Sequence, residues 1–241
     1  MPDPIFENAR LVEIYDAFDG PRSDLAPYVA IANELKAKSI LDIGCGTGCF
    51  ACMLSEKGFD VIGLDPAQAS LDKARKKPYA HRVRWILGDS NALPPLKVDL
   101  AVMTGNVAQV FLTEESWQTN LAAIRRTLRS NGHLVFEVRD PAQKAWANWT
   151  RAKTYQRIDI PHLGYVEGWC DVTAAAEGFV SFRWTYVFES DGQVLTSDST
   201  LRFREAGEII HSLEKSGYAV KDIRGAPDRP QQEFVFIAEA T

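Results

Sequence analysis

Three glycines at alternate positions follow an apolar stretch near the start of the chain. They are Gly44, Gly46 and Gly48, and the residue two positions before the first of them is Asp42. Glycine adopts positive φ angles and, having no Cβ atom, lets a ligand lie against the backbone. A helical pattern begins at Cys49, and the N-terminus of a helix offers unpaired N–H groups and partial positive charge. The stretch therefore predicts a strand, a ligand-binding turn and a helix.

Three chemistries use a loop of this kind. The spacing from Gly46 to Ala51 fits the fingerprint of nicotinamide and flavin sites. Cys45, Cys49 and Cys52 have the spacing of the cluster cysteines in radical enzymes that cleave S-adenosylmethionine. The motif as a whole, with its acid two residues before the first glycine, resembles the first motif of class I S-adenosylmethionine-dependent methyltransferases.

Two further acids help to choose between these chemistries. Asp65, followed by Pro66, ends the next predicted strand, where a carboxylate can accept hydrogen bonds from both hydroxyls of a ribose. Nicotinamide enzymes also place an acid there, so Asp65 alone does not discriminate. Asp89, with Ser90 beside it, ends the following strand, and the class I methyltransferases have an acid there that takes the adenine amino group. The ordered set of acids and glycines therefore favours the methyltransferase family over an NAD-type Rossmann oxidoreductase.

The cysteines give weaker support to the radical chemistry. Cys49 and Cys52 fall on a predicted helix among apolar neighbours, where a buried free cysteine is ordinary. The four histidines are scattered without metal-ligand spacing, so no metal site is expected.

Strands that alternate with helices must position these acids. Strand-like and helix-like patterns of apolar residues alternate from residue 39 to residue 140, which predicts a parallel, doubly wound sheet. Such sheets bind ligands outside the carboxyl ends of their strands. The residues predicted at those ends are Asp42, Asp65, Asp89, Asn106 and Arg139.

The pattern changes after the fifth strand. Three β-rich runs, 165–172, 179–188 and 194–203, predict an antiparallel meander, and Asp191-Gly192 is a hairpin signal between the last two. A helix and two strands close the chain. We therefore expect an α/β fold with a doubly wound, seven-stranded, Rossmann-like methyltransferase sheet and an antiparallel β insertion after the fifth strand. The predicted parts are N-terminal helices that either flank the sheet or form a lid (1–38), an S-adenosylmethionine-binding methyltransferase domain (39–145 and 200–241) and the β insertion (146–199).

The resemblance also implies roles for individual residues. The residues implied to bind the cofactor are Asp42, Gly44, Cys45, Gly46 and Gly48 for its methionine part, Asp65 and Pro66 for its ribose, Asp89 and Ser90 for its adenine, Thr104 beside its methyl group and Arg22 at its carboxylate. Candidates for catalysis or substrate handling are Tyr15, Asn106, Arg139 and His162. The implied cofactor is S-adenosylmethionine, with S-adenosylhomocysteine as the product.

Composition limits the partners. The net charge of −5 disfavours nucleic acid and anionic membranes, both of which favour a basic face. The segment 103–107 lacks the Asn/Asp-Pro-Pro-Tyr sequence of methyltransferases that act on nucleobases, which also disfavours nucleic acid. No apolar run approaches the ~20 residues of a membrane span, and the N-terminus does not look like a signal peptide. Four cysteines without a disulfide framework indicate a reducing cytoplasm.

We therefore expect a cytoplasmic enzyme that methylates an N or O nucleophile of a small molecule and that can form a homodimer. Two other functions remain open on sequence grounds. They are an NAD-type Rossmann oxidoreductase and a catalytically silent S-adenosylmethionine-binding protein.

Overall fold

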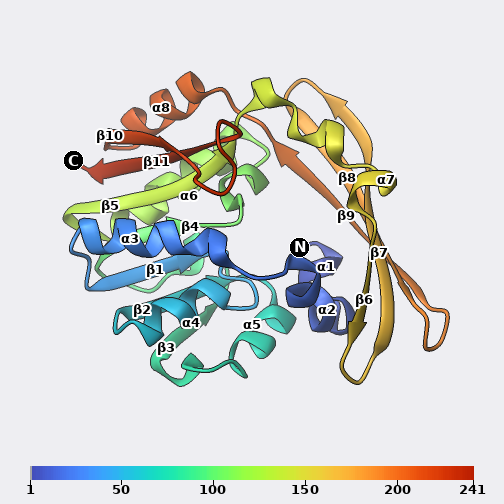
Figure 1. Cartoon of the computed structure of the whole chain (residues 1–241). Helices are drawn as coiled ribbons and strands as arrows, with labels where there is room; N and C mark the ends of the chain where they lie inside the picture. Colours follow the sequence, from blue (N-terminus) through green and yellow to red (C-terminus); the bar gives the residue numbers. More distant parts are fainter. Residues whose placement is uncertain (1) are drawn as a thin grey trace.

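The computed structural model describes residues 2–241 and contains two β-sheets. The main sheet has the strand order β10-β11-β5-β4-β1-β2-β3 (Figure 1). Its strands are β1 (Ser39–Ile43), β2 (Asp60–Asp65), β3 (Val83–Leu87), β4 (Val98–Met103), β5 (Leu128–Arg139), β10 (Tyr218–Gly225) and β11 (Glu233–Ala240). β1 to β5 run parallel, whereas β11 lies antiparallel to both β5 and β10. The predicted Rossmann-like methyltransferase sheet is confirmed.

Helices cover both faces of the main sheet. They are α3 (Ala26–Glu34), α4 (Cys49–Glu56), α5 (Gln68–Ala74), α6 (Glu114–Thr127) and α8 (Ala206–Lys215). Ile40 packs with residues of α3 and α4, whereas its neighbour Leu41 packs with residues of α6 and α8. Side chains alternate across a strand, so a strand buried on both faces has a continuous apolar sequence.

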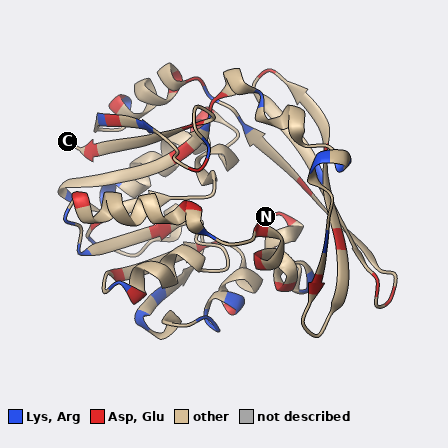
Figure 2. Cartoon of the chain, in the orientation of Figure 1, with Lys and Arg blue, Asp and Glu red and all other residues tan. Residues whose placement is uncertain are grey.

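Lys and Arg residues are interspersed with Asp and Glu along the chain (Figure 2).

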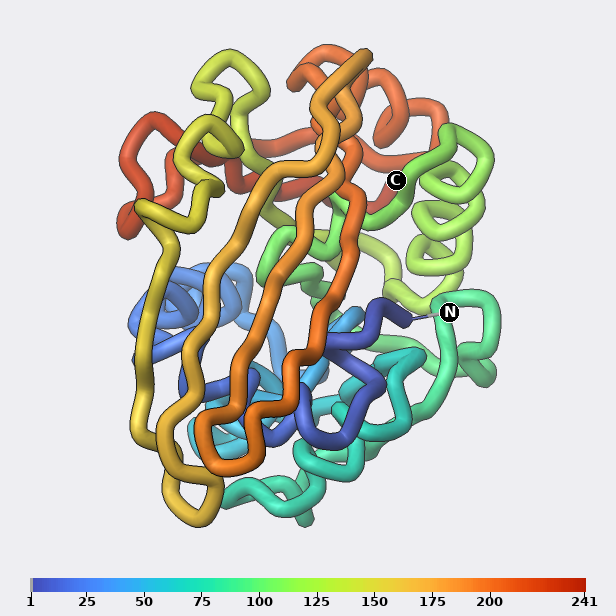
Figure 3. Tube along the Cα trace, turned by 90° about the vertical axis from the view of Figure 1, so that its right-hand side faces the viewer, coloured from blue at the N-terminus to red at the C-terminus, as the bar shows by residue number. Residues whose placement is uncertain are grey.

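The second sheet is the antiparallel insertion, and it follows the short helix α7 (Arg151–Thr154). Its strands are β6 (Gln156–Ile160), β7 (Gly164–Ala176), β8 (Phe179–Phe188) and β9 (Val194–Arg202), paired in chain order (Figure 3). The sequence pattern predicted only the last three. β6 was missed because it is an edge strand in which only Ile160 is buried, so its pattern is mostly polar.

Two N-terminal helices lie between the sheets (Figure 1). These are α1 (Pro4–Glu7) and α2 (Ala9–Asp19), and the side chain of Asn8 caps α2 by accepting from the N–H groups of residues 10 and 11. The backbone N–H of Ile5 donates to Oγ of Ser197 on β9 at 3.0 Å, and the hydroxyl of Ser70 on α5 donates to the carbonyl of Phe6 at 2.7 Å. The segment therefore bridges the two sheets.

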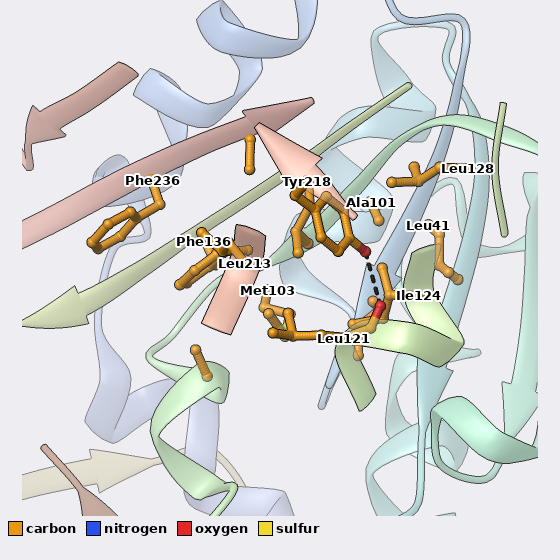
Figure 4. Close-up of a cluster of buried hydrophobic side chains, with 14 of the residues drawn as sticks. Leu41, Ala101, Met103, Leu121, Ile124, Leu128, Phe136, Leu213, Tyr218 and Phe236 are labelled. Carbon is orange, nitrogen blue, oxygen red and sulfur yellow. Dashed lines mark hydrogen bonds between the residues drawn. The ribbon is translucent and has the colours of Figure 1, made fainter. Parts of the chain in front are cut away.

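The core beneath α6 and α8 fixes the far half of the main sheet (Figure 4). Phe136 of β5 and Phe236 of β11 stack with ring centroids 5.3 Å apart, and both are fully buried. The hydroxyl of buried Tyr218 donates to the carbonyl of Leu121 at 3.0 Å, so its one polar atom is satisfied. Within residues 2–241 no helix is long and apolar enough to cross a bilayer.

Candidate functional site

The glycine turn between β1 and α4 adopts the backbone that the sequence predicts. Gly44, Gly46 and Gly48 have φ angles of 67°, 52° and 78°, a region that other residues rarely occupy. A Cβ atom on Gly44 would lie 2.6 Å from Val107, and one on Gly48 would lie 2.7 Å from Trp85. Gly46 has no neighbouring heavy atom within 4 Å of that position. The turn is therefore packed at both ends and open at its middle, where a ligand can approach the backbone.

Asp42 lies inside β1, directly before this turn, and is only 1% exposed. Neither of its carboxylate oxygens has a hydrogen-bond partner among residues 2–241. Burial raises the pKa of Asp42 to about 8, and the negative charge of Asp65 adds to the effect. Burying a carboxyl without hydrogen-bond partners costs folding free energy. A ligand that brings a hydrogen-bond donor or a positive charge would therefore be stabilised at this group.

Asp65 ends β2 and holds the glycine turn in place. Its two oxygens accept from the N–H groups of Gly46 and Ala67, each at 2.8 Å. Burial raises the pKa of Asp65 despite these two bonds. The carboxylate is therefore a structural link between β2 and the turn, and its remaining lone pairs are available to a ligand.

The next predicted acid, Asp89, is exposed and accepts from the N–H of Asn91 at 2.9 Å. Its neighbour Ser90 is buried, and its hydroxyl bonds the side chain of Asn120 on α6. Asp89 is thus placed at the carboxyl end of β3 with accessible oxygens. The hydroxyl of Ser90 is instead used to fasten this loop to α6.

Residues 40–132, which contain the glycine turn, Asp65 and Asp89, match the model of the methyltransferase domain family. These residues form a methyltransferase domain. The match supports the predicted resemblance to the class I S-adenosylmethionine-dependent methyltransferases, and with it S-adenosylmethionine as the cofactor.

Relatives are distant in sequence but similar in fold. The cypemycin N-terminal methyltransferase from Streptomyces sp is 29% identical over 59% of this chain and 60% of its own length. The CcbJ methyltransferase from Streptomyces caelestis is 18% identical, with a TM-score of 0.77 over 98% of this chain and 97% of its own. An S-adenosylmethionine-bound amino pentose methyltransferase from Micromonospora echinaspora is 20% identical, with a TM-score of 0.70 over 93% and 94%. The chain spans less than two thirds of the length of the curated relatives it matches.

The carboxyl end of β4 brings Asn106 into a buried polar cluster of the methyltransferase. Asn106 is 4% exposed and has a φ of 63°, which asparagine tolerates better than most residues. Its backbone N–H donates to Oε1 of Glu137 on β5 at 2.7 Å, and its amide nitrogen lies 3.4 Å from Glu233 on β11. Thr104, two residues earlier, is partly exposed at the same edge.

The two glutamates of this cluster were not predicted as site residues. Glu137 is 3% exposed and Glu233 is 4% exposed. Burial raises the pKa of Glu137 to about 7. The only sequence signal for Glu137 was an acid within the apolar run Leu134–Val138, and an acid in a strand buried on both faces needs a polar partner.

Arg139 joins this cluster from the end of β5. Its Nε lies 3.7 Å from Glu233, and its backbone N–H donates to Gln109 at 3.2 Å. Its guanidinium carbon lies 5.2 Å from the ring centre of Trp149, which leads towards the second sheet. Burial lowers the pKa of Arg139, although Glu233 opposes the change. The structure therefore brings Arg139 together with Asn106, as the sequence predicts.

The two N-terminal candidates are already engaged with other side chains. Arg22 pairs with Asp19 at 2.7 Å and with Asp24 at 2.9 Å. The ring of Tyr15 packs against Phe6 with centroids 5.5 Å apart, and burial raises its pKa above the ordinary range. Arg22 lies close enough to Asp42 for its positive charge to lower the pKa of that acid. Arg22 is therefore held by two acids near Asp42, whereas Tyr15 packs among the N-terminal helices and the second sheet.

His162 stands apart from the other candidates. It is exposed, with a φ of 70°, in the turn that joins β6 to β7. The structure does not bring it together with Asn106 or with the glycine turn.

A second group that the sequence did not reveal fastens α2 to the glycine turn. Asp16 accepts from the hydroxyl of Thr47 at 2.5 Å and pairs with Lys77 at 2.7 Å and with Lys73 at 3.4 Å. Lys77 also lies 2.9 Å from the sulfur of Cys49. The residues in each of these contacts are 28 to 61 positions apart in the chain, so no local pattern could indicate them. The N-terminal helices are therefore tied to the loop that they were predicted to cover.

The cysteines of the glycine turn are free thiols, and Cys45 and Cys52 are buried. Among residues 2–241 no group of three or more His, Cys, Asp and Glu side chains gathers as metal ligands do.

Proposed function

We propose that this chain binds S-adenosylmethionine at the carboxyl edge of its main sheet and transfers the methyl group to an N or O nucleophile of a small molecule. The observation that supports this most directly is a set of buried acceptor oxygens without partners at the carboxyl ends of β1, β4 and β5. They belong to Asp42 on β1, Asn106 in the loop after β4 and Glu137 on β5. The unpaired buried donor found with them among residues 2–241, Nε1 of Trp117, lies on α6. A ligand for this edge must therefore bring hydrogen-bond donors and positive charge, which S-adenosylmethionine has.

Each part of the cofactor has residues suited to it. Asp42 and the turn of Gly44, Cys45, Gly46 and Gly48 would hold the methionine part. Asp65 and Pro66 would hold the ribose, Asp89 and the Ser90 backbone the adenine, and Thr104 the region of the methyl group. Arg22 would bind the carboxylate only by leaving Asp19 or Asp24.

When bound, the cofactor supplies a methyl carbon that is already electrophilic because it is attached to a sulfonium. The protein then has little chemistry of its own to perform, beyond orienting the acceptor and excluding water. Tyr15 and the helices α1 and α2 would cover the site, since Asp16 ties α2 to the glycine turn. Asn106 and Arg139 lie on the side of the site towards the second sheet and are proposed to orient the acceptor. The position of His162 gives it no support as a catalytic residue.

The proposed acceptor is a small molecule rather than nucleic acid. Partly buried aromatic side chains pack on the second sheet, including Trp184 of β8 and Trp149, which precedes α7. Such rings suit a compact organic acceptor. One structural neighbour is an amino pentose methyltransferase, which agrees with this class. We further propose a cytoplasmic location, because the four cysteines are free, and a homodimer as an assembly to be tested.

Calorimetry on the apo protein tests the cofactor. We expect S-adenosylmethionine and S-adenosylhomocysteine to bind with micromolar affinity, about 8 kcal/mol. NADH serves as the control ligand, and tight NADH binding without a response to S-adenosylhomocysteine would indicate an oxidoreductase instead.

A screen of amines and alcohols, read out as S-adenosylhomocysteine formation, then tests transfer. Binding without turnover of any acceptor would favour a catalytically silent protein.

A further inference from the structure

Two buried oxygen atoms beside the loop after β4 have no hydrogen-bond partner in the part of the chain that the structure describes. They are Oδ1 of Asn106 and Oε2 of Glu137, on side chains that are 4% and 3% exposed. Two donors of Asn106 already have partners, because its backbone N–H bonds Glu137 and one N–H of its amide faces Glu233. What is missing at this point is therefore a hydrogen-bond donor from outside the protein.

The charges around these atoms define that donor further. Glu233 is balanced by Arg229 at 2.6 Å and by Arg139 at 3.7 Å. None of the ion pairs within residues 2–241 includes Glu137. Tyr28 and Arg139 both lie close enough to Glu137 to lower its pKa. The phenol of Tyr28 brings no positive charge, and the guanidinium of Arg139 is paired with Glu233 instead. A carboxyl without a basic partner, next to a second free acceptor, suits a compact cation with several N–H donors.

We propose that Glu137 and Asn106 form a subsite for a primary ammonium group. Oε2 and Oδ1 accept its N–H donors, and the carboxylate of Glu137 balances its charge. The inference rests on the proposed function, which brings two such groups to this edge of the sheet. One is the amino group of the cofactor's methionine part, and the other is the amine of a nitrogen acceptor.

Two variants separate this role from a structural one. Glu137→Gln keeps an oxygen for the N–H of Asn106 but replaces the free acceptor with an N–H₂ donor. Asn106→Gly removes Oδ1 and suits the positive φ of 63°, so the loop can retain its backbone. Glu239→Gln is the matched control, because this glutamate lies on β11 and pairs with Lys221 at 2.7 Å, outside the cluster.

The first experiment measures affinities by calorimetry for S-adenosylhomocysteine and for its deaminated analogue, in which hydrogen replaces the amino group. If the cofactor supplies the ammonium, both variants weaken S-adenosylhomocysteine by about tenfold or more and leave the analogue unchanged, since a hydrogen bond to a charged group is lost. The control variant binds both ligands as the wild type does.

The second experiment detects an acceptor amine. If the acceptor supplies the ammonium, both variants bind S-adenosylhomocysteine with the affinity of the wild type. Methylammonium chloride then raises the melting temperature of the S-adenosylhomocysteine-loaded wild type but not that of S-adenosylhomocysteine-loaded Glu137→Gln. Sodium chloride at equal concentration is the control salt.

An equal loss of affinity for both adenosyl ligands, or no response in either experiment, would overturn the subsite. A wild type that fails to bind S-adenosylhomocysteine would instead overturn the proposed function.

Discussion

The wild-type apo protein should lose stability as pH rises, and replacing Asp42 with asparagine should remove that loss. The stability of the variant relative to the wild type should therefore increase with pH. Burial raises the pKa of Asp42 to about 8 in the folded protein, whereas an aspartate in an unfolded chain has a pKa of about 3.9. The folded state therefore binds the proton more tightly than the unfolded state. The stability that this group contributes is complete below a pH of about 4 and is lost as pH rises through about 8.

The size of the effect follows from these two pKa values. Inside that window each pH unit is worth about 1.4 kcal/mol, so the wild type loses about 2.7 kcal/mol between pH 5 and pH 7. The amide of Asp42→Asn does not titrate. Its own cost of burial is the same at both pH values and cancels from the comparison. For a chain of 241 residues the change corresponds to roughly 5–11 °C in relative melting temperature.

The assay is thermal unfolding of both apo proteins at pH 5, 6, 7 and 8. Asp60→Asn is the control, because Asp60 is an exposed acid at the other end of β2. The melting temperature of Asp42→Asn minus that of the wild type should rise steadily with pH. A difference that stays constant from pH 5 to pH 7, or that falls, would refute the claim that Asp42 is buried without a partner. The same variant should bind S-adenosylmethionine more weakly, because the unpaired carboxyl is the group proposed to meet the ligand.

Three other variants test the remaining contacts. Asp65→Ala should weaken S-adenosylhomocysteine binding, measured by calorimetry, roughly 30- to 150-fold. It should also lower the melting temperature of the apo protein, because two hydrogen bonds from backbone N–H groups are lost. Unchanged affinity would show that Asp65 has only a structural role. Asp16→Ala should free α2 from the glycine turn and speed S-adenosylhomocysteine dissociation several-fold in stopped flow, whereas an unaltered rate would exclude α2 as a cover. Gly48→Ala should lower the free energy of unfolding in urea by more than ~1 kcal/mol, because its Cβ atom would lie 2.7 Å from Trp85. Gly46→Ala should lower it by less, because no heavy atom lies within 4 Å of that Cβ position. Equal losses of stability in the two variants would contradict the explanation from packing.

The sequence alone was sufficient for the features that depend on local pattern. The alternate glycines required positive φ angles, and the structure gives 67°, 52° and 78° at Gly44, Gly46 and Gly48. Strand and helix periods set the parallel part of the main sheet, because side-chain alternation and turn residues act over a few positions. The N-terminal helices, the antiparallel insertion and the closing hairpin also follow from such short-range signals. β6 was missed because an exposed edge strand leaves little apolar pattern.

Only the tertiary structure determined which partner each polar side chain meets. Arg22 was predicted to bind the cofactor, but the fold places it between Asp19 and Asp24. Ser90 was expected beside the adenine with Asp89, and only the fold shows that its hydroxyl bonds Asn120.

Burial, too, was decided by the fold rather than by the local sequence. Glu137 and Glu233 are 96 positions apart in sequence and meet only because β5 pairs with β11, with Glu137 beside Val235 and Glu233 beside Arg139 in the register. A hydrogen bond or ion pair depends on the three-dimensional position of two atoms, and chain neighbours carry no information about a partner so many residues away. For the same reason the unpaired oxygens of Asp42, Asn106 and Glu137, on which the proposed site depends, appear only once the sheet has assembled around them.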